Sequence, residues 1–151
     1  MKKFIIPFIL LVSLTACSVY PNSYPFENRN EPITCIELLY YPWVDDESKP
    51  FKEFQLIRTL EDDEIPEFMD AIYALETKKV EPPWSNYGPY IARVYYENGD
   101  IENFASWHIE FVKSGEKSLA QGIYRFTENT FDELFLEYAE RQTTRESEDG
   151  S

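Results

Sequence analysis

The sequence predicts a two-layer α+β domain, an antiparallel sheet of about five strands with two amphipathic helices on one face. Two observations lead to this fold class. Segments with the two-residue alternation of strands flank an Asn98-Gly99 turn, and two other segments carry apolar residues at helical spacing. A sheet of this kind has to bury one face, and the two helices can cover it. We expect one such domain, over residues 33–141.

The clearest strand signals are the segments 90–97 and 100–112, on either side of Asn98-Gly99. Asn-Gly accepts the positive φ angles of a two-residue turn, so Glu97 is expected opposite Asp100. In this register the apolar face carries Ala92, Val94, Tyr96, Ile101, Ala105, Trp107, Ile109 and Phe111. The other face carries Arg93, Tyr95, Glu102, Phe104, Ser106, His108 and Glu110, a mixture that permits a partner there.

Three further strands are predicted from runs of β-branched and aromatic residues bounded by turn residues: 33–41, 54–60 and 119–126. In the strand over 54–60, Phe54, Leu56 and Leu60 are expected to share one face. Arg58 falls on the same face, although its charge fits an apolar face imperfectly.

Two helices are predicted from their apolar spacing. The first has Asp62 or Asp63 as its cap and Pro66 in its first turn, and its packing face is formed by Ile65, Phe68, Met69, Ile72 and Leu75. The second opens with a capping box of Thr130 and Glu133, and its face is formed by Phe131, Leu134, Phe135 and Tyr138. Residues 142–151 lack apolar side chains and are expected to form a disordered acidic tail.

The N-terminus has the layout of an export signal. Lys2 and Lys3 precede an apolar run from Phe4 to Leu14. An uncleaved membrane helix is the alternative, but spanning a bilayer takes roughly 20 apolar residues, and this run is shorter. We therefore expect a signal peptide over residues 1–16, cut after Ala16.

The tetrapeptide Leu14-Thr15-Ala16-Cys17 resembles the lipobox of bacterial lipoprotein precursors. The resemblance implies that Cys17 receives a diacylglyceryl group, becomes the first residue and anchors the chain to the membrane through palmitate-like acyl chains. Secretion without lipid, after the same cut, is the alternative. Ser18, where inner-membrane lipoproteins carry Asp, favours the outer membrane in a host with two membranes.

Residues 17–32 are expected to form the lipidated cysteine and a semi-rigid tether, because prolines recur there among polar residues. Tyr24 and Phe26 suggest that this tether lies partly on the domain surface. The domain beyond it loosely resembles small, uncharacterised bacterial lipoproteins with a sheet, two helices and an Asn-Gly hairpin, a resemblance that implies no activity.

The chain is strongly acidic, with 28 Asp+Glu against 14 Lys+Arg and a net charge of -14. Loss of Lys2 and Lys3 with the signal makes the mature chain two units more negative. Such a surface repels phosphate backbones and anionic lipid head groups alike, so neither nucleic acid binding nor direct electrostatic membrane binding is expected, whereas attraction to a basic partner stays open. Hydrophobic residues, at 43%, are sufficient for a core.

Trp84 and Tyr87 are the candidate partner-binding residues. They lie in the segment 78–89, where three prolines and a glycine are expected to prevent regular structure. Aromatic side chains on a stiff loop suit recognition. The alternative is that Trp84 folds back as a lid over the sheet.

We predict no catalytic residue, metal site or cofactor. His108 is the only histidine, but residues two apart on one strand are nearly 7 Å apart, so Ser106 and Glu110 do not form a secured nucleophile-base pair with it. An ordinary sheet-surface histidine is expected. Cys35 is expected to be a small buried thiol. The acidic run 61–64 needs no metal, because the macrodipole favours negative charge at the N-terminus of a helix.

Three functional hypotheses follow. The first is a lipid-anchored envelope lipoprotein that acts as a small interaction module for an envelope protein or glycan. The second is an acidic inhibitor or immunity lipoprotein that neutralises a basic enzyme or toxin. The third is an envelope enzyme that uses His108.

Overall fold

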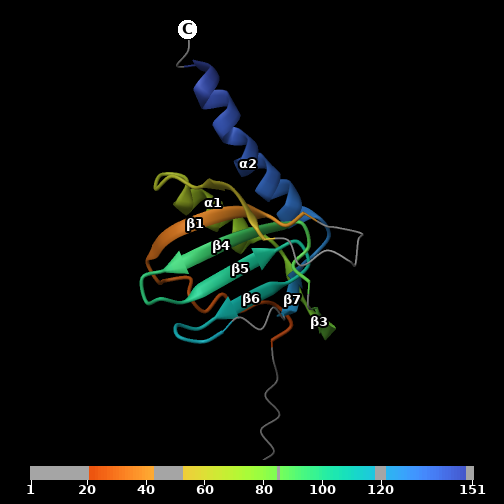
Figure 1. Ribbon diagram of the computed structural model, residues 1–151. Coiled ribbons are helices and arrows are strands. Elements are labelled where there is room, and N and C mark those ends of the chain that lie inside the picture. The colour runs from red at the N-terminus through yellow and green to blue at the C-terminus, as the bar shows by residue number, and fades with distance from the viewer. Residues whose placement is uncertain (1–20, 43–52, 85, 118–121, 149–151) are drawn as a thin grey trace, which may run out of the picture.

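The computed structural model describes residues 21–42, 53–84, 86–117 and 122–148 (Figure 1). One antiparallel sheet of seven strands, in the order β2-β1-β4-β5-β6-β7-β3, is combined with two helices. The elements are β1 (Ile33–Tyr40), β2 (Gln55–Thr59), α1 (Ile65–Ala74), β3 (Thr77–Trp84), β4 (Tyr90–Tyr96), β5 (Ile101–Ala105), β6 (Ile109–Val112), β7 (Gly122–Phe126) and α2 (Thr130–Glu148). The α+β class is confirmed, and the prediction of about five strands is wrong.

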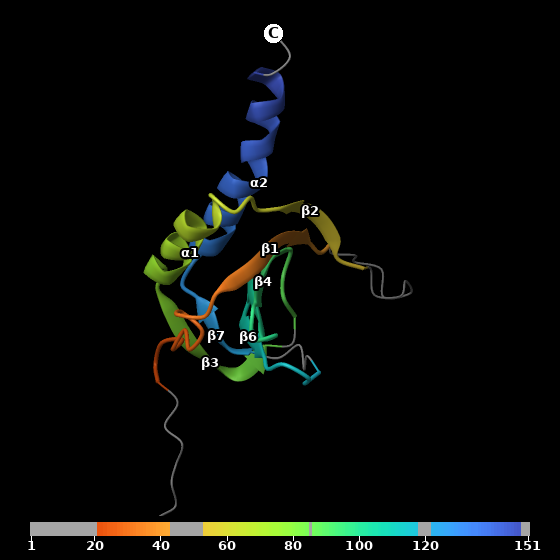
Figure 2. The ribbon, with the colours of Figure 1, turned by 90° about the vertical axis from the view of Figure 1, so that its left-hand side faces the viewer.

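Both helices lie on one side of the sheet, here called the helix face (Figure 2). Six of their predicted packing residues are buried against strand residues in a single core: Phe68, Met69, Ile72, Phe131, Phe135 and Tyr138. The other three, Ile65, Leu75 and Leu134, are partly buried at its margin. The opposite side, here called the open face, carries Glu37, Arg93, Asn103 and Glu110. It has no helix in front of it in Figure 1.

Residues 21–32 are packed on the domain as well. The rings of Tyr24 and Phe26 lie against the core of the helix face, and the hydroxyl of Tyr124 donates a hydrogen bond to the carbonyl of Pro21 at 2.9 Å. The segment expected to be a tether is therefore docked from Pro21 onward.

The hairpin between β4 and β5 has a longer loop than predicted. Gly99 N–H donates to the Tyr96 carbonyl at 3.0 Å, and Tyr96 N–H donates to the Asp100 carbonyl at 3.1 Å. Gly99 has a φ of 86°, the left-handed position that ends a three-residue hairpin loop. As a result Tyr95, and not Tyr96, pairs with Ile101.

This shift by one residue reverses the faces of β5, because successive side chains of a strand point to opposite sides. Glu102 and Phe104 are buried on the helix face, although the open face was predicted for both. Ile101 and Ala105 lie on the open face, although the core was predicted for them.

Replacing Gly99 by Val should lower the free energy of unfolding by about 1–3 kcal/mol, because a β-branched residue is strained at positive φ. A Cβ at this position would also lie 2.6 Å from Ser114 Oγ. The matched control is Gly115→Val, which has the same strain at a φ of 81° but no atom within 4 Å of a new Cβ, so it should lose less stability than Gly99→Val. Urea denaturation measures the unfolding midpoint of both variants. A midpoint of Gly99→Val equal to that of the wild type would contradict the three-residue loop.

Two differences account for the larger number of strands. The predicted strand over 100–112 is divided into β5 and β6, which pair with each other after a turn at residues 106–108. In addition, β3 forms in the segment predicted to be irregular. Pro82 and Pro83 are tolerated there because β3 is an edge strand that pairs, among the described residues, with β7 alone. The register of this pair shifts between Lys79 and Trp84.

The register of β2 against β1 shifts at Ile57. Arg58 and Leu60 are buried, whereas Leu56 is 55% exposed. The prediction that Phe54, Leu56 and Leu60 share one face is therefore wrong. The physical reason is the extra residue of a β-bulge, which reverses the side chains that follow it.

The helix starts also differ from the predicted caps. The N-cap of α1 is Glu64, with no side-chain cap hydrogen bond, so neither Asp62 nor Asp63 caps it. Pro66 lies in the first turn, as expected. At the start of α2, the N–H of Glu133 donates to the carbonyl of Asn129 at 3.1 Å and not to the hydroxyl of Thr130, so the predicted capping box is not formed.

The second helix continues beyond Arg141 to Glu148 and projects from the body of the domain (Figure 1). It takes up most of the segment that the sequence predicts as a tail. Gln, Arg and Glu are good helix formers, and no proline or glycine interrupts them before Gly150. Residues 149–151 lie outside the described residues, as do the signal peptide, Ala16, Cys17 and the start of the strand predicted over 119–126.

Candidate partner-binding face

A row of polar side chains crosses the open face. Pairing between neighbouring strands sets these residues opposite one another: Thr59, Glu37, Arg93, Asn103 and Glu110. Arg93 Nε donates to Asn103 Oδ1 at 2.9 Å, and Asn103 Nδ2 donates to Glu110 Oε2 at 2.9 Å. Asn103 and Glu110 are buried, so this part of the face is a fixed hydrogen-bonded layer.

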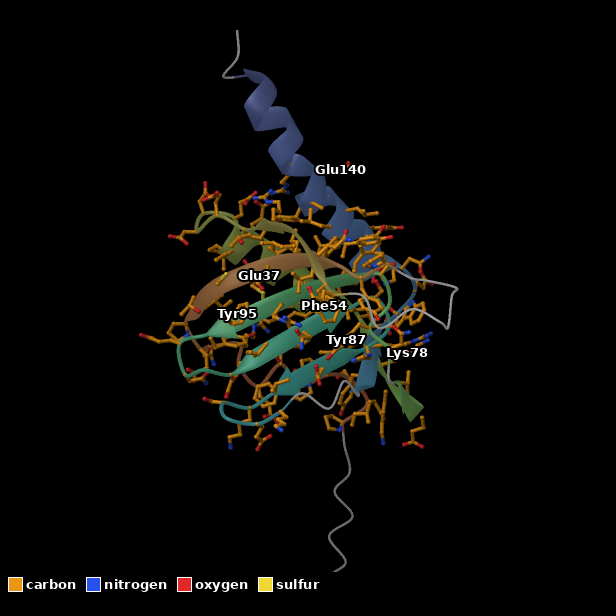
Figure 3. All side chains as sticks on the ribbon, in the orientation of Figure 1. Glu37, Phe54, Lys78, Tyr87, Tyr95 and Glu140 are labelled. Carbon is orange, nitrogen blue, oxygen red and sulfur yellow. The ribbon has the colours of Figure 1, made fainter. Side chains whose placement is uncertain are left out.

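Tyr87 lies over this row and takes part in the packing of the domain. Its hydroxyl donates to the carboxylate of Glu110, and its ring stacks on His108 with the ring centroids 4.5 Å apart. Tyr87 and Phe54, whose ring centroids are 5.8 Å apart, cover a small apolar cluster formed by Leu39, Ile91 and Ala105 (Figure 3). The ring of Tyr87 is therefore held against the sheet.

Trp84, the other candidate, comes from a different element. Its backbone pairs with Gly122 at the end of β3. The side chain of Trp84 lies outside the part of the chain that the structure describes. The backbone thus places Trp84 on an edge strand and Tyr87 over the open face.

His108 is fully buried, so the prediction of a sheet-surface histidine is wrong. Its Nδ1 lies 3.0 Å from the carbonyl oxygen of Asn86 and must donate a hydrogen there, because a carbonyl only accepts. Burial lowers the pKa of His108, while the Asn86 carbonyl and the Glu110 charge raise it. The ring also touches Gly122, where a Cβ would lie 2.7 Å from His108 Cδ2.

The chemical consequence is a neutral imidazole that is enclosed by the fold. Its Nε2 has no hydrogen-bond partner among the described residues. The His108 side chain is 0% exposed, so its ring has no contact with solvent in this structure.

Cys35 is half-buried and free, on the open face opposite Tyr95. Burial and the charge of Glu37 raise the pKa of its thiol. A thiol that stays protonated at neutral pH is a weak nucleophile.

Strand β2 carries exposed apolar side chains that were not predicted to be exposed. Leu56 is 55% and Ile57 is 42% exposed. Because β2 pairs with β1 alone, one side of its backbone has no neighbouring strand among the described residues. No signal in the sequence marks these two positions, since their exposure depends on the bulge at Ile57.

A buried carboxylate lies on the helix face, apart from the open face. Glu102 is 1% exposed and accepts hydrogen bonds from the hydroxyls of Tyr24 and Tyr96. Burial raises the pKa of Glu102, and the two phenol hydrogen bonds lower it. Because Tyr24 belongs to the N-terminal segment, Glu102 ties that segment to the sheet.

Within the described ranges, no three His, Cys, Asp or Glu side chains are grouped closely enough to hold a metal ion. In the same part of the chain, no helix is long and apolar enough to cross a membrane.

The chain matches no family model, no curated protein and no solved structure.

Proposed function

We propose that this chain is an exported lipoprotein, anchored to the cell envelope by lipid on Cys17, whose domain binds a protein partner through strand β2. The observation that carries the proposal is the exposure of Leu56 and Ile57 on an edge strand. The signal layout and the lipobox-like Leu14-Thr15-Ala16-Cys17 support the anchor.

An edge strand with exposed apolar residues is suited to a protein partner. Unpaired backbone N–H and C=O groups can accept an added strand, and side chains next to them provide specificity. Edge strands of this kind are usually protected by charge or proline, but Leu56 and Ile57 are aliphatic. A glycan partner is less favoured, because Phe54 and Tyr87 are packed against the sheet.

The open face gives this edge a rigid support. Arg93 lies over the ring of Phe54, with its guanidinium carbon 5.3 Å from the ring centroid, and hydrogen-bonds to Asn103. A surface that is already ordered loses little conformational entropy on binding. The enclosed ring of His108 gives no comparable support to an envelope enzyme.

The binding surface is tested with Ile57→Lys, in affinity capture from envelope extract with the mature lipoprotein. A charge on the edge should oppose strand addition and lower recovery of the partner by about tenfold or more. Leu136→Lys is the matched control, because Leu136 is 39% exposed but lies on α2; its recovery should equal that of the wild type.

Equal recovery by Ile57→Lys and the wild type would contradict binding through β2. Added salt separates the alternatives further. Binding that is insensitive to Ile57→Lys but lost at moderate salt would favour the acidic inhibitor of a basic partner.

A further inference from the structure

We infer that the edge formed by β3 and β7 is the membrane-facing surface of the domain and contacts lipid phosphate groups. The inference rests on the lipid anchor at Cys17 proposed above. It adds an orientation and a lipid-contact surface to that anchor.

The point where the chain enters the domain is fixed by hydrogen bonds. Tyr124 donates through its hydroxyl to the Pro21 carbonyl at 2.9 Å, and Lys79 N–H donates to the Asn22 carbonyl at 3.1 Å. Tyr124 belongs to β7 and Lys79 to β3, which are neighbours at one edge of the sheet. The N-terminal segment therefore joins the domain at this edge.

The remaining linker is short. Only residues 18–20 separate Cys17 from Pro21, and an extended chain of this length spans about 14 Å at most. A free tether as far as Pro32 would reach about 50 Å. Because acyl chains on Cys17 would hold that residue at the bilayer surface, Pro21 and the β3–β7 edge must lie close to it.

The same edge carries an unusual pair of like charges. Lys78 and Arg125 are directly opposite each other across β3 and β7. Like charges in this arrangement destabilise a sheet. Neither has a carboxylate partner within the described ranges, whereas the neighbouring Lys79 is paired with Glu81 at 2.9 Å. Arg125 Nε is also buried without a hydrogen-bond partner there.

Phosphate oxygens of lipid head groups would offset this repulsion, since they accept charge-assisted hydrogen bonds from Lys and Arg. The chain as a whole is acidic, with a net charge of -14 over the full sequence, so its other surfaces are repelled by an anionic bilayer. The phosphate contact and the repulsion of the acidic surfaces both favour an orientation with the β3–β7 edge toward the bilayer. Figure 3 shows Lys78 at the right-hand side of the sheet and Glu140 above the sheet on α2, so α2 would point away from a bilayer at the β3–β7 edge.

This orientation also agrees with the proposed binding edge. Strands β3 and β2 are the two edges of the sheet. With β3 directed to the lipid, β2 stays accessible to a protein partner in the envelope.

The orientation is tested with the full lipidated protein in vesicles of phosphatidylcholine and phosphatidylglycerol that carry a quencher on the head groups. A fluorophore is placed at Glu81→Cys on β3 or at Glu140→Cys on α2, both exposed positions, in a Cys35→Ser background. Quenching should be about threefold or more stronger at residue 81, given the short linker. Equal quenching, or stronger quenching at residue 140, would overturn the orientation.

The phosphate contact is tested by Lys78→Glu/Arg125→Glu in the same vesicles. The quenching at residue 81 divided by that at residue 140 should fall by about half, because both cations are replaced by carboxylates that the lipid phosphates repel. An unchanged ratio would overturn the phosphate contact.

The mass of the N-terminal peptide from the same sample separates two kinds of failure. A chain without lipid on Cys17 would contradict the anchor and the orientation together. Lipid on Cys17 combined with equal quenching would overturn the orientation alone and leave the anchor in place.

Discussion

Arg58→Met should lower the free energy of unfolding by about 3–5 kcal/mol, because it leaves a buried charge without its partner. Arg58 is 8% exposed and Glu64 is 7% exposed, and Arg58 Nη2 donates to Glu64 Oε2. Without the guanidinium, the Glu64 carboxylate keeps only the hydrogen bond from Glu61 N–H at 3.0 Å among the described residues.

The loss extends beyond one ion pair. Arg58 Nη1 also donates to the carbonyl of Tyr138 at 3.0 Å, so this side chain connects β2, the start of α1 and the middle of α2. Helix α2 packs on β4 and touches α1. A defect at Arg58 should therefore loosen the attachment of both helices.

Urea denaturation of Arg58→Met is compared with Arg141→Met. Arg141 also pairs with two carboxylates, Glu67 and Glu137, but its side chain is 32% exposed, and exposed pairs contribute up to about 1 kcal/mol. Removing both partners in Arg58→Met/Glu64→Leu should recover part of the loss. Equal destabilisation by Arg58→Met and Arg141→Met would contradict the buried pair.

Glu102→Gln should flatten the dependence of stability on pH. In the wild type, burial raises the pKa of Glu102 above its ordinary value of 4.5. The folded protein therefore keeps a proton that the unfolded chain releases, and stability falls as the pH rises above 4.5, by up to about 1.4 kcal/mol per pH unit until the folded-state pKa is passed.

Chemical denaturation between about pH 5 and 8 measures this slope. Glutamine keeps the size of the side chain and an oxygen that accepts from Tyr24 or Tyr96, but it does not titrate. The control Glu116→Gln removes an exposed carboxyl and should keep the wild-type slope. A wild-type slope in Glu102→Gln would show that another group causes the pH dependence.

Helical periodicity was sufficient to predict the core side of α1. Phe68, Met69 and Ile72 recur at helical spacing, and all three are buried. Phe131, Phe135 and Tyr138 of α2 also recur at helical spacing, and all three are buried. This pattern depends on local geometry alone, so it can be recognised without tertiary contacts.

The strand errors came from features that the sequence does not mark. The turn at residues 106–108 contains Ser, Trp and His, without the glycine or proline that would signal it. The loop around Gly99 is three residues long, and Asn-Gly also fits the two-residue turn that was predicted. The prolines of β3 are compatible with a strand only because β3 lies at an edge.

The open face could be predicted only in part. Arg93, Tyr95 and Glu110 were expected there, and their strand pairing places them there. The stacking of Tyr87 on His108 was missed because it depends on a chain reversal at residues 106–108. A glycine inside a strand indicates a bulge or a close approach, and Gly122 does leave room for the histidine, but the sequence does not show which residue approaches it.

The lipid anchor is tested most directly by the mass of the N-terminal peptide of the protein recovered from the membrane fraction. We expect a chain that begins at Cys17 and carries a diacylglyceryl group, and a Cys17→Ser variant that is uncleaved or free of lipid. A wild-type peptide that begins at Met1, or an unmodified Cys17, would contradict the anchor, and so would an acylated mature N-terminus in the Cys17→Ser variant.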